Sequence, residues 1–123
     1  MNTLKEKLDS IRAALDVDVT GVDIDSLIEK GKALAQLIGL SAACKAESKA
    51  NLERARGVAL SSLMIEEPKC PPSVLLKLVE SECDNQILLY EYADRLNAGI
   101  THQLDYYRSI ISLHKVELEN SLK

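Results

Sequence analysis

The sequence predicts an all-α protein: a long antiparallel helical hairpin preceded by a short amphipathic helix. The chain has no Phe and no Trp, and its apolar residues are Leu, Ile, Val and many Ala, which suit helix packing better than sheet packing. All three prolines lie in one short segment between two long proline-free segments. Along both long segments, apolar or small residues recur every three or four positions, which is the spacing of one helix face.

The N-terminal helix is predicted over residues 3–16. Leu4, Leu8, Ile11 and Leu15 share one face of this segment. Thr3 and Glu6 have the spacing of a capping box, in which each side chain accepts a backbone N–H of the other residue. A helix this short is marginally stable alone, so it must pack on other helices, either of its own hairpin or of a neighbouring chain.

Residues 17–25 predict an acidic loop. Its opening resembles a calcium-binding loop, with oxygen ligands available from Asp16, Asp18 and Thr20. Leu27 stands where such a loop needs a bidentate Glu, so the coordination shell would be incomplete. Capping of the next helix by Asp23 or Asp25 explains these carboxylates better, and we expect no metal site here.

A long helix is predicted over residues 26–65, because its many Ala residues have high helix propensity. Gly39 could interrupt this helix, since glycine is unfavourable in a helix interior. Residues 26–64 carry six basic and three acidic residues, whereas residues 73–123 carry five basic and eight acidic residues. This imbalance favours two oppositely charged helices lying side by side.

The segment 66–72 predicts the turn of the hairpin, because proline inside a helix loses a hydrogen bond and clashes with the preceding turn. Pro72 also suits the first turn of a second long helix, predicted over residues 73–122. Positions on this helix repeat with a period of about 3.5 residues, which is typical of a coiled-coil seam. The seam includes Tyr90, Asn97, Ile100, Leu104, Tyr107, Ile111 and His114.

The seam predicts self-association. A hairpin of two helices leaves much of its apolar surface uncovered, and the short N-terminal helix can cover only part of it. We therefore expect a homo-oligomer, preferably a dimer that completes a four-helix bundle. Asn97 and His114 lie on the seam, where polar residues fix register and oligomeric state at some cost in stability.

The composition excludes several function classes. The formal net charge of −4 argues against indiscriminate nucleic-acid binding. There is no apolar run long enough for a membrane span and no signal peptide, and three cysteines without a close pair do not form a disulfide framework. These features predict a protein of the cytoplasm.

No catalytic or cofactor-binding pattern is recognisable, so we expect a protein that is not an enzyme and needs no cofactor. A di-iron bundle would place Glu three residues before His102 and His114, where Gly99 and Ile111 stand instead. No phosphate-binding glycine loop or nucleophile elbow occurs. A Cys–His pair such as Cys83 with His102 would be more than five turns apart on one helix.

Two surfaces are candidates for partner binding. The first is a polar and aromatic cluster formed by His102, Asp105, Tyr106 and Arg108, whose alternative interpretation is a purely structural role in helix register and pairing. The second is a basic stripe formed by Lys45, Lys49 and Arg56, which share a helix face and could contact phosphates. For the second, a solvated helix face is the competing explanation.

The C-terminal segment resembles small uncharacterised helical proteins encoded by phages and prophages, notably of Bacteroides-type bacteria. The resemblance covers Pro71–Leu122 and is carried most specifically by the run HQLDYYRSIIS, of the form HQLD-x-x-RS-x-IS. It implies a mobile-element origin and a bacterial host cytoplasm, and it implies no activity. The sequence thus favours a non-catalytic oligomeric interaction protein, with a nucleic-acid or nucleotide-binding accessory factor of phage DNA metabolism as the alternative.

Overall fold

The computed structural model describes residues 3–16 and 23–122, and four helices account for almost all of them. They are α1 (Leu4–Leu15), α2 (Ile24–Glu66), α3 (Pro72–Glu82) and α4 (Asp84–Ser121). The described residues contain no strand, so the all-α fold class is confirmed. The expected loop at 17–25 falls largely outside the described residues, which resume at Asp23.

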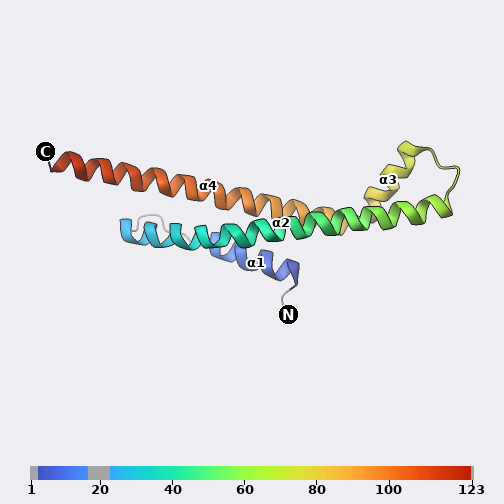
Figure 1. The fold of residues 1–123 in the computed structure, drawn as a ribbon, viewed down its shortest axis with the longest axis horizontal. Helices are drawn as coiled ribbons and strands as arrows, with labels where there is room; N and C mark the ends of the chain where they lie inside the picture. Colours follow the sequence, from blue (N-terminus) through green and yellow to red (C-terminus); the bar gives the residue numbers. More distant parts are fainter. Residues whose placement is uncertain (1–2, 17–22, 123) are drawn as a thin grey trace.

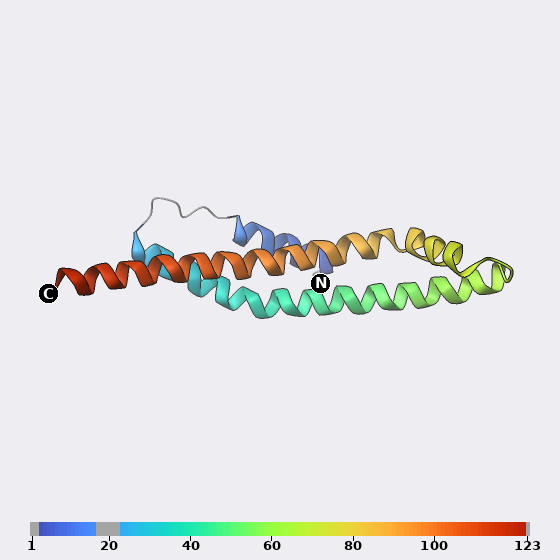
Figure 2. The same cartoon turned by 90° about the horizontal axis from the view of Figure 1, so that it is seen from above.

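The molecule is an elongated hairpin in which α2 and α4 run antiparallel along most of their length (Figures 1 and 2). Helix α1 packs against both long helices, and α3 lies against the C-terminal part of α2. In this single chain the N-terminal helix packs in cis, on its own hairpin. The C-terminal end of α4 extends past the beginning of α2 in both views.

Local sequence signals account for most helix ends. Thr3 Oγ1 accepts the Glu6 N–H at 3.2 Å, and the Thr3 N–H donates to Glu6 Oε2 at 3.4 Å, so the expected capping box is present. The Asp23 side chain caps α2 by accepting the Ser26 N–H at 2.9 Å. Helix α2 continues through Gly39 without a break. The proline turn occupies residues 67–71, and Pro72 begins α3 as expected.

The single helix expected over residues 73–122 is instead two helices separated at Cys83. The Cys83 N–H donates to the carbonyl of Glu80 at 3.1 Å rather than to that of Val79. Leu75, Val79, Cys83 and Ile87 all pack in the cluster against α2. Consecutive steps of four residues rotate this row by about 40° per step around a helix. A straight helix would therefore turn part of this row away from α2. No Gly or Pro occurs in residues 73–98, so the sequence gives no signal of the break.

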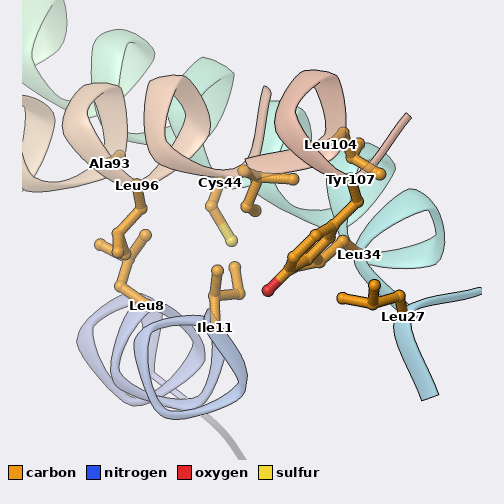
Figure 3. Close-up of a cluster of buried hydrophobic side chains, with 10 residues drawn as sticks. Leu8, Ile11, Leu27, Leu34, Cys44, Ala93, Leu96, Leu104 and Tyr107 are labelled. Atoms are coloured by element: carbon orange, nitrogen blue, oxygen red, sulfur yellow. The ribbon is translucent and has the colours of Figure 1, made fainter. Parts of the chain in front are cut away.

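The core has two parts. The first lies where α1, α2 and α4 meet and contains Leu8, Ile11, Leu34 and Ile100, all with no exposed surface (Figure 3 shows the first three, with their neighbours). The second lies between α2, α3 and the start of α4. It is formed by Leu52, Ala59, Leu63, Val79 and Cys83. The first part is the larger, because α1 covers the ridge that α2 and α4 leave open.

Candidate functional site

The polar surface predicted on α4 lies entirely in solvent. His102, Asp105, Tyr106 and Arg108 are all exposed, and Tyr106 retains 62% of its surface. Asp105 and Arg108 form an ion pair of 3.7 Å along the helix. The Tyr106 ring lies 5.8 Å from that of Tyr107, measured between centroids. Exposed ion pairs of this kind contribute little stability, so a partner could replace this one at little cost. All four side chains are accessible because they are exposed.

The basic stripe on α2 is largely paired with carboxylates of the same chain. Lys45 Nζ lies 2.8 Å from Asp94 Oδ1 of α4, and this hydrogen bond raises the pKa of Lys45. Arg56 makes two hydrogen bonds to Glu80, of 2.7 and 3.0 Å, and a further one to Glu53. Lys49 is exposed, and no ion pair to it is found among the described residues. The pairs with Asp94 and Glu80 connect α2 to α4 and α3, and all of them reduce the charge available to phosphates.

The helix seam contains polar contacts that connect α4 to α2. Asn97 Nδ2 donates to Ser41 Oγ at 3.2 Å, and Ser41 has no exposed surface. Ser48 is also buried, but its hydroxyl donates to the Lys45 carbonyl of its own helix at 2.8 Å. Only the first bond depends on which residue of α4 lies opposite α2, so it helps to set the helix register within the chain.

Burial of the other seam residues is greatest in the middle of the seam. Ile100, Leu104 and Tyr107 are buried, whereas Tyr90 and Ile111 are partly exposed. His114 is exposed, as is Leu118 with 63% of its surface accessible. The seam therefore continues beyond the part of α4 that α2 covers.

The end of α1 is bound by polar side chains that the sequence analysis did not single out. Lys30 Nζ donates to the carbonyl of Ala14, and Gln103 Nε2 donates to that of Leu15 at 3.2 Å. Burial lowers the pKa of Lys30, and the nearby Asp16 carboxylate opposes this effect. The last carbonyls of a helix lack intrahelical donors, so these two side chains supply hydrogen-bond donors to the C-terminal carbonyls of α1. The sequence alone could not pair Lys30 and Gln103 with these carbonyls, because the pairing depends on where α1 packs.

A hollow of about 260 Å³ lies between α2 and α4, near the beginning of α2. Its lining is mainly apolar and includes Ile28, Gly31, Ala35, Leu104, Tyr107 and Ile111. Lys32 and Arg108 also line it and provide two cationic groups. The sequence singled out four of these residues, all on α4: Leu104, Tyr107, Arg108 and Ile111. It could not show which residues of α2 lie opposite them, because that depends on the register of the two helices.

The described residues offer no arrangement suited to metal binding, since no group of three or more His, Cys, Asp or Glu side chains converges among them. The thiols of Cys44 and Cys83 are buried, and burial raises the pKa of Cys44. A raised pKa keeps the thiol protonated and less nucleophilic. Over residues 3–16 and 23–122, no helix combines the length and hydropathy that crossing a membrane would require.

Comparisons with known proteins found no matching family model, curated protein or solved structure.

Proposed function

We propose that the protein is a non-catalytic interaction protein that acts as a homo-oligomer, preferably a dimer, and presents polar helix faces to a protein partner. The observation that carries this proposal is the large apolar surface that the single chain leaves uncovered. Leu118 and Leu122, about one helical turn apart at the C-terminal end of α4, expose 63% and 80% of their surfaces, respectively. Contiguous exposed apolar surface on a small protein is typical of an interaction site.

The polar part of the proposal rests on the exposed side chains of α4. His102, Asp105, Tyr106 and Arg108 extend from a rigid helix and make few contacts with the rest of the chain. A helix face with an aromatic residue and an arginine has the composition of many protein-binding surfaces. The resemblance to phage and prophage proteins supports a setting in the cytoplasm of a bacterial host, and the proposed role needs no cofactor.

Measurement of the molar mass in solution by light scattering tests the oligomer. We expect a mass near twice the 13.5 kDa of one chain at micromolar concentration. A monodisperse monomer at high micromolar concentration would contradict the proposal.

The nucleic-acid alternative is tested separately by fluorescence anisotropy with a labelled single-stranded DNA at low salt. Electrostatic binding is strongest under these conditions. The pairing of Lys45 with Asp94 and of Arg56 with Glu80 leads us to expect no binding. Tight binding that weakens steeply with added salt would favour the alternative.

A further inference from the structure

The end of α4 extends beyond the helix that it packs against. Ile28 and Ile111 line the same hollow, and the two helices are antiparallel. Ile24, the first residue of α2, therefore lies level with roughly residue 115, since both helices rise ~1.5 Å per residue. The segment Val116–Leu122 continues past this point, as both views of the fold show (Figures 1 and 2).

This segment, which we call the C-terminal extension, carries an apolar ridge. Leu118 and the C-cap residue Leu122 follow Ile111 at spacings of seven and eleven residues, so they continue the face of α4 that carries Ile111. Ile111 is partly covered by α2, whereas Leu118 and Leu122 are 63% and 80% exposed. The face of α4 that packs against α2 therefore remains apolar where it extends into solvent.

The hollow has an apolar lining and carries the charge opposite to that of the extension. Gly31 opens its α2 wall, because a Cβ built on this residue would find no atom within 4 Å. Lys32 and Arg108 line the hollow, and their carboxylate neighbours Glu29 and Asp105 lie at 3.4 and 3.7 Å in exposed, weak pairs. On the extension, Glu117 and Glu119 flank Leu118 on either side.

We propose that the hollow receives the C-terminal extension of a second copy of this chain, and that the two copies exchange extensions reciprocally. Leu118 and Leu122 of one copy would cover the apolar lining, with Glu117 and Glu119 near Lys32 and Arg108. This inference rests on the proposed homo-oligomer and specifies its interface.

A second copy is the occupant that satisfies both features at once. The extension and the lining residue Ile111 are about two turns apart on α4. Two α4 helices that meet antiparallel around His114 and Lys115 therefore place each extension over the other copy's hollow. Such an interface is isologous and closes at two chains. Lys115, which directly precedes the extension, would lie near the two-fold axis rather than against Lys32 and Arg108.

The first test compares two aspartate substitutions at equally exposed leucines of α4. Leu118 and Leu88 are 63% and 62% exposed, but only Leu118 belongs to the extension. We expect Leu118→Asp to raise the dimer dissociation constant at least about tenfold, as loss of a buried interface anchor does. Leu88→Asp should leave it unchanged. Sedimentation equilibrium measures the constants, and circular dichroism verifies that both variants remain helical.

The second test locates the two-fold axis by cross-linking in full-length protein carrying Cys70→Ser. His114→Cys should give a covalent dimer with a short bismaleimide, whereas Leu88→Cys should not. Suppose that the wild-type protein is a dimer but position 114 gives no cross-link and Leu118→Asp has no effect. This result would refute the proposed binding of the extension in the hollow and leave the proposed homo-oligomer intact. A monomeric wild-type protein would refute both proposals.

Discussion

The two parts of the core differ in whether they contain side chains with no exposed surface at all. Where α1 joins α2 and α4, Leu8, Ile11, Leu34 and Ile100 have no exposed surface. In the α2–α3 part, Leu63 and Val79 are 6% and 4% exposed, and nearby Ile65 and Leu76 retain 81% and 60% of their surfaces. The comparison shows that a twelve-residue helix, α1, converts an open two-helix ridge into a closed core.

Truncating one leucine in each part of the core gives the largest expected effect. Leu34→Ala should lower the free energy of unfolding by about 3–5 kcal/mol, because it leaves a cavity enclosed on three sides. Leu63→Ala should cost about 2–3 kcal/mol, because its surroundings can relax towards solvent. Urea unfolding followed by circular dichroism measures both. Equal losses would show that α1 adds no closure to the core.

Two buried serines sharpen the comparison at the polar level. Ser41→Ala should cost about 1 kcal/mol, because it removes the acceptor of the Asn97 amide and leaves that group partly buried. Ser48→Ala should be close to neutral, because its hydroxyl bonds only to the Lys45 carbonyl of its own helix. A double-mutant cycle with Asn97→Ala should show coupling for Ser41 and none for Ser48. Coupling at both positions would contradict the assignment of register to Asn97 and Ser41.

Two glycines test how tightly each part is packed. Gly57→Ala should stabilise the protein by about 0.5–1 kcal/mol, because alanine favours the helix and no atom lies within 4 Å of the added Cβ. At Gly99 the Cβ would lie 3.1 Å from the Leu15 Cδ2 atom of α1. Displacing Leu15 should cancel most of this gain. Thermal unfolding compares the two variants, and an equal gain at Gly99 would show that α1 is loosely seated.

The beginning of α2 responds to acid through its capping residue, Asp23. The hydrogen bonds from Ser26 hold the pKa of Asp23 below its usual value of 3.8. A lowered pKa in the folded state contributes stability that is present above pH 3.8 and is lost as the pH falls through the folded value. Asp23→Asn keeps a capping oxygen but cannot titrate, so it should flatten the pH dependence of stability below pH 4. Unfolding curves at several acidic pH values measure this, and an unchanged slope would contradict it.

Most of the fold could be predicted because its signals are local. The capping box of Thr3 and Glu6, the turn prolines and the alanine-rich segment each act within a few residues of chain. The break at Cys83 could not be predicted, since no helix-breaking residue lies there. Gly39, the interruption considered from sequence, lies in a continuous helix.

The sequence predicted which residues the candidate surfaces contain, but it could not predict which residues lie next to one another across the two helices. The opposite charge of the two long segments predicted their contact, yet which cations pair with carboxylates depends on the register. Lys45 meets Asp94 and Arg56 meets Glu80, whereas Lys49, on the same face, meets neither. The hollow containing Lys32 and Arg108 depends on the same register.

The break at Cys83 also affects how the molecule opens. Because α3 and α4 are separate helices, α3 and the proline turn can detach from α2 while α4 keeps its contacts with α1 and α2. Local opening of this kind requires less free energy than global unfolding. Amide hydrogens of α3 should therefore exchange with solvent sooner than those near Ile100, and the tip of the hairpin would be a separate cooperative unit.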